Sequence, residues 1–225
     1  MKVSIITPTF NRVGTLKEAI KSVLLQTHNN WELIIQDGCL DNLAVRDEEF
    51  SQLIRDARIT YLLGKDSGIT NALNIAASKA TGDIMVEMND DDALYDENSL
   101  EVVNHFFNNV HDVEWIYSKM QYMDKDGVGG GEAGFQTSLE ELLKGNTICQ
   151  PTVFWRKSLF DRVGGFDESF PYAQDYELWI RFWKASPPYF LDIITAKYRI
   201  HEGSITSSLG GKQAEDAARV KQKHQ

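Results

Sequence analysis

The sequence has few cysteines and no long apolar run. Cys39 and Cys149 are the only cysteines among 225 residues, too few for a disulfide framework, and their spacing fits no zinc pattern. Such sparse cysteine usage indicates a reducing cytoplasm. No stretch approaches the roughly 18 apolar residues of a membrane span, and the apolar run near the N-terminus is too short for a signal peptide. We therefore expect a cytoplasmic location, with at most peripheral contact at the inner face of a membrane.

Basic residues are also in deficit. Lys and Arg number 23 against 33 Asp and Glu, which gives a formal net charge of −10. Nucleic acid is not an expected partner, because a surface that binds a duplex needs clustered basic residues to neutralise its phosphates. An anionic substrate would need local basic residues or a bridging cation. The 42% of hydrophobic and 25% of charged residues are ordinary for a globular protein, and we expect one domain.

The most informative stretch is residues 80–92. A turn at Thr81-Gly82 leads into an apolar run that predicts a buried strand, and the strand ends in Asn89 followed by three aspartates. Closely packed carboxylates raise one another's pKa unless solvent or a cation relieves the repulsion. Mg²⁺ or Mn²⁺ commonly lies between one or two carboxylates and the phosphates of a substrate. The run therefore predicts either a metal-diphosphate site or, as is usual for a charge run, a solvated acidic loop.

Strands and helices alternate through the N-terminal half. A strand at 3–7 is expected to stop at Pro8, and Thr15 with Glu18 predicts a capping box for the first helix. The other expected elements are strands at 31–36 and 59–63, a helix at about 42–57, a helix that opens after Gly68 and ends at Gly82, and the strand of the acidic stretch. This alternation predicts an α/β fold with a parallel sheet.

Four loops of this half are expected at one edge of the sheet. Residues 9–12, Asp37, Asp66 and the aspartate run each follow a strand. In parallel sheets, ligands bind beyond the carboxyl ends of the strands. Because the four loops converge there, we favour the metal-diphosphate site over the solvated loop.

The C-terminal half is less regular. A helix at about 100–107, a strand at 113–117 and a hairpin turn at Asp126-Gly127 are expected. Residues 129–134 formally match the dinucleotide fingerprint, but they do not join the first strand to the first helix, so we interpret them as a loop rather than as part of a Rossmann dehydrogenase. Residues 208–225 show no clear apolar face and predict a peripheral polar tail.

A second group of polar residues opens an aromatic helix near residue 174. Tyr176, Trp179 and Ile180 recur at helical spacing, which is typical of a face that packs in a core. Asp175 lies in the first turn. It either caps the helix, which spacing alone favours, or acts as a general base whose pKa is raised by apolar surroundings.

Taken together, these segments resemble the inverting glycosyltransferases of family 2, whose nucleotide-diphospho-sugar transferase fold is called GT-A. The segments that carry the resemblance are 5–12, 36–38, 66–74, 80–92, 174–181 and 198–206. The resemblance implies a Rossmann-like, mostly parallel central sheet flanked by helices, with a smaller acceptor-side region. It also implies a single domain over residues 1–207, with a nucleotide-binding half at about 1–92 and an acceptor-binding half at about 93–207.

The resemblance implies roles for individual positions. The residues expected to contact the nucleotide are Thr7, Pro8, Thr9, Asn11, Arg12, Asp37, Asp66, Gly68, Asn74 and Asp90. The expected ligands of Mn²⁺ or Mg²⁺ are Asp91, Asp92 and His201, although a surface or capping role remains an alternative for a lone histidine. The expected catalytic base is Asp175, and the residues expected to face the acceptor are Gln150, Trp179 and Arg181.

The implied reaction is the transfer of one sugar, with inversion, from a nucleotide-diphosphate sugar to a hydroxyl of a saccharide or lipid-linked saccharide. The expected nucleotide is UDP. Two features depart from the family pattern: Asn89 stands where many members carry an aspartate, and Cys39-Leu40 replaces small polar residues. The Gln-Arg-Arg-Trp signature of processive synthases is absent, which indicates single transfer.

Two alternatives remain open. A sugar-nucleotide nucleotidyltransferase would use a related fold, but residues 9–14 lack the glycine-rich basic loop that binds a triphosphate. A catalytically silent homologue would keep the nucleotide pocket without turnover.

Overall fold

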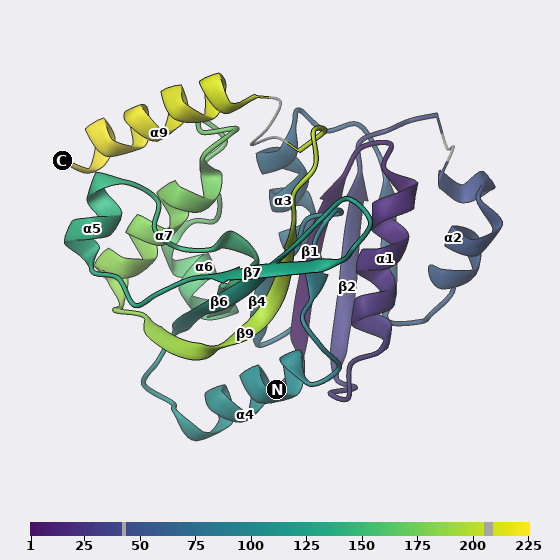
Figure 1. The fold of residues 1–225 in the computed structure, drawn as a ribbon, viewed down its shortest axis with the longest axis horizontal. Coiled ribbons are helices and arrows are strands. Elements are labelled where there is room, and N and C mark those ends of the chain that lie inside the picture. Colours follow the sequence, from purple (N-terminus) through teal and green to yellow (C-terminus); the bar gives the residue numbers. More distant parts are fainter. Residues whose placement is uncertain (42–43, 205–208) are drawn as a thin grey trace.

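The computed structural model describes residues 1–41, 44–204 and 209–225 (Figure 1). The elements of its N-terminal half are β1 (Val3–Thr9), α1 (Val13–Leu24), β2 (Trp31–Asp37), η1 (Ala44–Arg46), α2 (Glu48–Leu53), β3 (Ile59–Leu63), α3 (Ile69–Ala77) and β4 (Ile84–Glu87). Those of the C-terminal half are β5 (Ala93–Leu94), α4 (Ser99–Asn109), β6 (Trp115–Met123), β7 (Gly129–Ala133), α5 (Leu139–Lys144), η2 (Gln150–Thr152), β8 (Phe154–Arg156), α6 (Lys157–Val163), α7 (Gln174–Ala185), β9 (Tyr189–Arg199) and α9 (Gly210–His224). The predicted α/β class is confirmed.

One sheet runs through the molecule in the order β3-β2-β1-β4-β8-β6-β9-β5, and β7 pairs with β6. The first four strands along the chain, β1 to β4, are parallel to one another, as the alternation predicts. Beyond β4 the sheet is mixed, because β8 runs antiparallel to both β4 and β6. The parallel half therefore directs the carboxyl ends of four strands to one edge.

Pro8 does not end β1, contrary to our expectation. Pairing with β2 continues to Thr9, whereas pairing with β4 ends at Ile6. The Ile6 carbonyl accepts a hydrogen bond from the Met88 N–H on the β4 side. Because alternate residues of a strand point their polar groups to the same side, the N–H that Pro8 lacks would face the side that β4 has left. The proline therefore removes no hydrogen bond from this sheet.

The predicted start of the first helix is also wrong. α1 begins at Val13, and its N-cap residue Arg12 makes no side-chain cap. Thr15 and Glu18 lie inside the helix, so they cannot form a capping box. Its buried residues Leu16, Ala19, Ile20 and Val23 recur at helical spacing and form one apolar face.

Two further element boundaries differ from the predictions. The helix expected at 42–57 is represented by η1 and α2, and Asp47 caps α2 by accepting a hydrogen bond from the Phe50 N–H at 2.8 Å; positions 42 and 43 lie outside the described residues. α3 ends at Ala77 rather than at Gly82. Gly82 instead allows a close approach of two chain segments, because a Cβ there would lie 2.6 Å from Ser4 Oγ.

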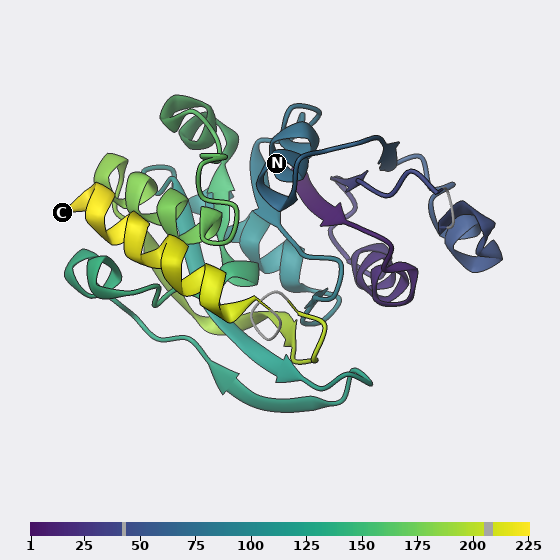
Figure 2. The same ribbon diagram turned by 90° about the horizontal axis from the view of Figure 1, so that it is seen from above.

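The glycine-rich segment that we interpreted as a loop forms β7. It pairs antiparallel with β6 through Met120 and Ala133. The predicted turn at Asp126-Gly127 is confirmed, since the Asp124 N–H donates to the Val128 carbonyl across it. Figure 2 shows the resulting hairpin extending along one side of the molecule.

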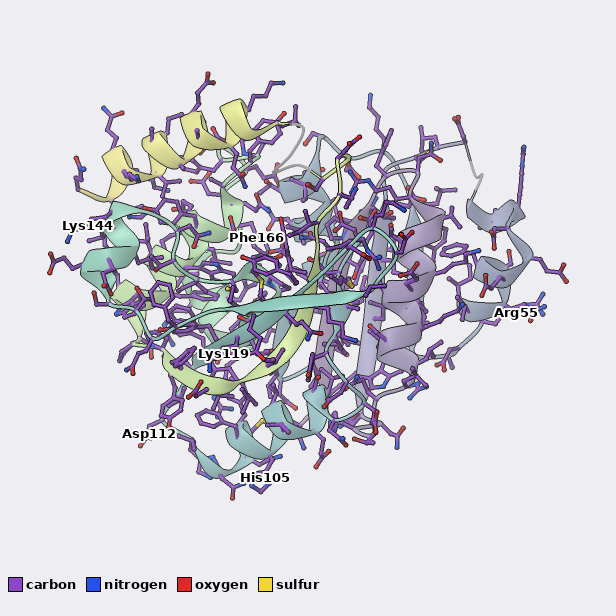
Figure 3. The ribbon with its side chains drawn as sticks, viewed as in Figure 1. Arg55, His105, Asp112, Lys119, Lys144 and Phe166 are labelled. Atoms are coloured by element: carbon purple, nitrogen blue, oxygen red, sulfur yellow. The ribbon has the colours of Figure 1, made fainter. Side chains whose placement is uncertain are left out.

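Two hydrophobic cores cover the two faces of the sheet. One lies beneath α1, α2 and α4 and includes Ile5 of β1. The other lies beneath α3, α5, α6 and α7 and includes Ile6. The alternation of these two residues is what a strand buried on both faces requires. In the second core Trp155 packs against Phe160 and Phe166, the latter labelled in Figure 3.

The segment that we expected to be a peripheral tail contains α9, which packs along α7 (Figure 2). Val220 is fully buried there, and Asp216 accepts a hydrogen bond from the Tyr172 N–H at 3.0 Å. Lys223 lies 2.7 Å from the buried carboxylate of Glu177. The expectation is wrong because α9 is held largely by polar contacts, which leave little apolar periodicity in the sequence. Within the described ranges, no helix is both long and apolar enough to cross a membrane.

Candidate active site

The end of β1 reaches the acidic turn that follows β4. Thr9 Oγ1 donates a hydrogen bond to Asp90 Oδ2 at 2.6 Å. Arg12 Nη1 lies 3.0 Å from Asp91 Oδ2 and 3.6 Å from Asp90 Oδ1. The convergence predicted from the order of strands and loops is thus visible as direct contacts between residues from the first and fourth strands.

The acidic turn carries buried charge. Asp90 and Asp92 are 5% and 1% exposed. Burial, followed by the nearby charge of Asp91, raises the pKa of Asp90 to about 7, and the same two causes raise the pKa of Asp92 well above its usual range. A cation beside these carboxylates would favour their ionised forms. The turn is therefore not a solvated loop.

Arg199, at the end of β9, ties the C-terminal segment to this turn. Its backbone N–H donates to Asp92 Oδ1 at 3.0 Å, and its Nε donates to the Asp91 carbonyl at 2.9 Å. Two residues later, His201 Nε2 lies 2.8 Å from Asp91 Oδ2. The structure therefore brings the predicted metal ligands Asp91 and His201 into contact.

A cavity of about 640 Å³ opens at this point, within the size range of small-ligand sites. The predicted site residues that line it are Pro8, Thr9, Arg12, Asp66, Gly68, Asp90 and Asp91. Residues of the C-terminal segment, such as Ser204, complete its wall. Asp92 does not line it, since its carboxylate is engaged by Arg199 and lies 3.5 Å from the Asn89 amide.

The loops after β2 and β3 meet beside this cavity. Asp37 is buried, and its carboxylate accepts hydrogen bonds from the Cys39 N–H at 2.8 Å and the Tyr61 hydroxyl at 2.6 Å. Burial, and then the bond to this carboxylate, raises the pKa of Tyr61. A Cβ on Gly38 would lie 2.5 Å from Asp66 Oδ2, and that oxygen is buried without a hydrogen-bond partner in the described chain. Asp66 is therefore available to a ligand that donates a hydrogen bond.

A second cavity, of about 470 Å³, lies on the C-terminal side. Asp175, which we expect to be the base, and Gln150, which we expect to face the acceptor, both line it. Asn146 Nδ2 donates to Asp175 Oδ2 at 3.0 Å. Burial raises the pKa of Asp175 despite this bond and those from first-turn N–H groups. The N-cap residue of α7 is Ala173, so Asp175 is not the cap that spacing favoured.

The two cavities adjoin. Ile69, Asn89 and Tyr198 line both. Asn89 Nδ2 also donates to Gln150 Oε1 at 3.0 Å, and Gln150 Nε2 donates to the Glu87 carbonyl at 3.0 Å. The asparagine that departs from the family pattern therefore connects the acidic turn to the second cavity.

Two residues predicted to face the acceptor lie elsewhere. Trp179 is fully buried in the aromatic core, stacked on Trp115 with ring centroids 6.1 Å apart. Arg181 lines neither of these cavities and instead binds Glu177 and the Val163 carbonyl. The acceptor-side roles that the resemblance implied for these two residues are therefore wrong, whereas the core position of Trp179 agrees with its helical spacing.

Four predicted nucleotide contacts, Thr7, Asn11, Asp37 and Asn74, are likewise not part of the first cavity. Thr7 is fully buried. Asn11 is exposed, with a backbone φ of 54°, and does not line the cavity. Asn74 binds the loop that follows α6, through the Phe166 N–H and carbonyl at 3.1 and 3.0 Å. Asp37 and Asn74 instead hold neighbouring backbone through hydrogen bonds. Direct nucleotide contact by these four residues stays a prediction.

Sequence reasoning missed three residues of the site. Arg199 lies within the segment of resemblance, but nothing in its spacing indicated a buried guanidinium that bridges the acidic turn. Asn146, which orients Asp175, comes from an irregular segment without a motif. Glu87 was not among the expected site residues, yet it lines the second cavity; its polar character inside an apolar strand was the available signal.

The donor set beside the first cavity fits a hard divalent cation. Asp91 and His201 present an oxygen and a nitrogen, and the raised pKa of Asp90 indicates carboxylates that a positive charge would stabilise. Among the described residues, no group of three or more His, Cys, Asp or Glu side chains forms a complete metal site. Phosphate oxygens of a bound nucleotide would complete such a set, as is common for Mg²⁺.

The similarity of this chain to known proteins agrees with the site. The family model described as glycosyl transferase family 2 matches residues 4–163. An uncharacterized glycosyltransferase of Rickettsia prowazekii is 30% identical over 220 residues, which cover 92% of this chain and 66% of that protein. A UDP-Glc:alpha-D-GlcNAc-diphosphoundecaprenol beta-1,3-glucosyltransferase of Escherichia coli is 30% identical over 212 residues, covering 92% of this chain and 80% of that protein. Among five Rickettsia relatives, the chain spans between 30% and 66% of their lengths.

Solved structures show the same fold. The crystal structure of S. aureus TarS 1–349 in complex with UDP-GlcNAc has a TM-score of 0.75 at 20% identity, covering 92% of this chain and 61% of that chain. The mannosyltransferase PcManGT from Pyrobaculum calidifontis, in complex with GDP-Man and Mn²⁺, has a TM-score of 0.72 at 16% identity, covering 97% of this chain and 62% of that chain. The predicted GT-A type of α/β fold is thereby confirmed.

Proposed function

Because the chain belongs to glycosyl transferase family 2, we propose that it moves one sugar from a nucleotide-diphosphate sugar to an acceptor hydroxyl. The observation that carries this proposal is the junction of the two cavities at Ile69, Asn89 and Tyr198. A donor in the first cavity and an acceptor in the second would hold the reacting atoms together, which removes much of the entropic cost of their encounter.

The first cavity would hold the nucleotide. The free oxygen of Asp66 would accept a hydrogen bond from the nucleoside, and Asp37 would position the adjoining loop. Thr9 and Arg12 would lie beside the diphosphate, where the Arg12 guanidinium supplies positive charge. UDP is the proposed nucleotide; the E. coli relative is named for UDP-Glc and TarS was crystallised with UDP-GlcNAc, whereas PcManGT was crystallised with GDP-Man.

Asp91 and His201 would hold Mn²⁺ or Mg²⁺, with Asp92 behind them. The ion, when bound, would neutralise the diphosphate as it leaves. Arg12 and His201 both contact Asp91 Oδ2, so the Arg12 guanidinium and the His201 imidazole already converge on this carboxylate. Arg199 fixes the turn from behind through its two bonds to Asp91 and Asp92.

Asp175 would be the base. Its carboxylate would take the proton of the acceptor hydroxyl as that oxygen attacks the anomeric carbon from the face opposite the diphosphate. Asn146 holds one carboxylate oxygen, and the raised pKa makes Asp175 a stronger base than an ordinary aspartate. A single displacement inverts the anomeric centre and requires no nucleophilic carboxylate.

The acceptor and its location are further parts of the proposal. The E. coli relative is named for a GlcNAc unit on diphosphoundecaprenol. A saccharide or lipid-linked saccharide is therefore our proposed acceptor, and the lipid-linked form would place the reaction at a membrane surface. The two free cysteines support a cytoplasmic location.

Analysis of the products tests the function. Incubation with UDP-sugars, Mn²⁺ and a panel of saccharides should release UDP and yield an extended saccharide. Release of pyrophosphate from UTP and a sugar phosphate would instead identify a nucleotidyltransferase. A protein that binds UDP but never releases it from a UDP-sugar with any acceptor would be a silent homologue.

A further inference from the structure

The second cavity has an unusual distribution of charge. Its two charged lining residues are Glu87 and Asp175, and no Lys, Arg or His of the described chain lines it. The remaining polar lining side chains are mostly neutral amides, namely Asn89, Asn146, Gln150, Gln174 and Gln213. An anionic group would enter without a basic partner and would meet Asp175, whereas amides both donate to and accept from hydroxyl groups.

Glu87 is the least explained of these residues. It is 1% exposed, and neither carboxyl oxygen has a hydrogen-bond partner in the described chain. Burial, followed by the charge of Asp175, raises the pKa of Glu87 well above its usual range. The nearby Gln174 amide opposes this in part, but its geometry does not make it a hydrogen-bond partner of either carboxyl oxygen. A buried carboxyl group without partners is costly to the fold. Its presence beside a cavity therefore points to a ligand that supplies the missing hydrogen bonds.

Asn89 repeats this pattern at the junction of the two cavities. Its Oδ1 atom is buried and has no hydrogen-bond partner in the described part of the chain, while its Nδ2 is bound to Gln150. Two unsatisfied acceptors thus line the path from the acidic turn to Asp175. A ligand that donates hydrogen bonds would satisfy these oxygen atoms.

Aromatic side chains provide the apolar part of the lining. Tyr122 and Tyr198 lie edge to face with ring centroids 6.2 Å apart, and Phe135 is 56% exposed although it lines the cavity. An amphipathic ligand can place its apolar surface on such rings and its polar groups on the amides. A sugar ring has this character, with C–H groups on its faces and hydroxyl groups around its edge.

We propose that the second cavity takes the reacting sugar ring of the acceptor as an uncharged, hydroxyl-rich ring, rejects a ring that carries a carboxylate, and uses Glu87 as a specificity-determining residue. That the bound sugar is the acceptor rests on the proposed function, but the binding of the sugar to this cavity does not require catalysis. A neutral carboxylic acid at position 87 both donates and accepts, so it matches a hydroxyl group in either orientation.

Binding of matched sugars, without nucleotide or metal, tests the inference. Methyl glucoside and methyl galactoside are each compared with the corresponding uronic acid glycoside, so that each pair differs only in a CH₂OH or a carboxylate. Ligand-observed NMR titration at pH 7 should show at least one neutral sugar binding roughly tenfold or more tightly than its uronate. Equal or tighter binding of the uronates, or no binding of either neutral sugar, would overturn the proposal.

Three variants assign the effect to Glu87. Glu87→Leu removes the hydrogen-bonding group and should weaken the neutral sugar roughly tenfold. Glu87→Gln keeps a donor and an acceptor and should stay within about threefold of the unmodified protein. Glu114→Gln, which removes a carboxylate from an ion pair with Arg162 outside the cavity, is the matched control and should not change binding.

The contrast between the first two variants separates recognition from structure. If Glu87 only supported the fold, Leu and Gln would alter sugar binding alike, and that result would contradict the proposal. Far-UV circular dichroism and melting curves check that each variant folds. If Glu87→Leu does not fold, a loss of sugar binding in folded Glu87→Gln would contradict the proposal. If the protein releases no UDP from UDP-sugars but still binds a neutral sugar more tightly than its uronate, the proposed reaction is refuted and this inference stands.

Discussion

His201 and Asp91 are 110 residues apart in the sequence, yet the imidazole Nε2 lies 2.8 Å from the carboxylate oxygen Oδ2. Arg12 reaches the same oxygen from the loop after β1, at 3.0 Å. Asp91 therefore connects three separate segments at the mouth of the first cavity. Replacement of Asp91 should therefore weaken ligand binding more than replacement of either Arg12 or His201 alone.

Asp91→Asn should abolish stabilisation by UDP with Mn²⁺. For the unmodified protein, a ligand at 100 times its Kd adds about 2.7 kcal/mol to the free energy of unfolding, so the melting temperature should rise. The variant loses the charge that the cation needs and should show no rise. Asp161→Asn, on the exposed face of α6, is the control. An equal rise in both variants would rule out Asp91 as a ligand.

Asp175→Asn should retain UDP binding but lower sugar transfer. Loss of a general base costs on the order of 10²–10⁴ in rate. In the unmodified protein kcat/KM should fall as the pH drops through the pKa of Asp175, and burial places that fall above the usual range of an aspartate. Steady-state rates across pH measure both effects. A variant that keeps full activity would exclude Asp175 as the base.

Arg199→Ala should destabilise the fold strongly. The side chain is buried, and its guanidinium donates to the carbonyls of Asp91, Asp124 and Lys125. Loss of these bonds and of the ion pair with Glu18 leaves the carbonyl of the buried Asp91 unsatisfied and should lower the free energy of unfolding by about 3 kcal/mol. Urea denaturation measures the change. Arg162→Ala, which breaks a half-exposed ion pair, should have little effect; similar losses in both variants would contradict this account.

Glu177→Ala should detach α9 from α7. Burial alone would raise the pKa of Glu177, but Arg181 and Lys223 outweigh it and lower the pKa. The Glu177 carboxylate therefore stabilises the fold at pH values above its ordinary pKa. This contribution is lost as the pH falls through the lowered pKa of the folded state. Its removal should cost about 3–5 kcal/mol at pH 7, because Lys223 loses a buried partner.

Hydrogen exchange in α9 measures this detachment. The amides of α9 should exchange faster in Glu177→Ala, and the stability difference from the unmodified protein should shrink toward low pH. Glu140→Ala, which removes an exposed partner of Lys144 on α5, is the control. Unchanged protection of α9 in Glu177→Ala would show that its apolar contact through Val220 is sufficient.

Local chemistry in the sequence predicted much of the parallel half and the edge at which the site lies. The apolar runs of β2 and β3 and the turns after them specify strands whose polar loops must meet, because parallel connections return each strand to the same edge. For this reason Thr9, Arg12, Asp66 and the acidic turn were found together in the first cavity. The ends of the strands were less well predicted. At Pro8, for example, β1 continues to pair with β2 after its pairing with β4 has ended.

The sequence by itself determined the α/β class, the family and the chemical character of the acidic turn, since these depend on residue types at short spacing. Only the tertiary structure decided that His201 and Arg12 meet at Asp91, that Arg181 lies away from both cavities, and that Glu87 lines a cavity without a hydrogen-bond partner among the described residues. Such facts depend on the packing of segments far apart in the chain. Neither helical period nor motif spacing encodes which neighbour a buried polar side chain will meet.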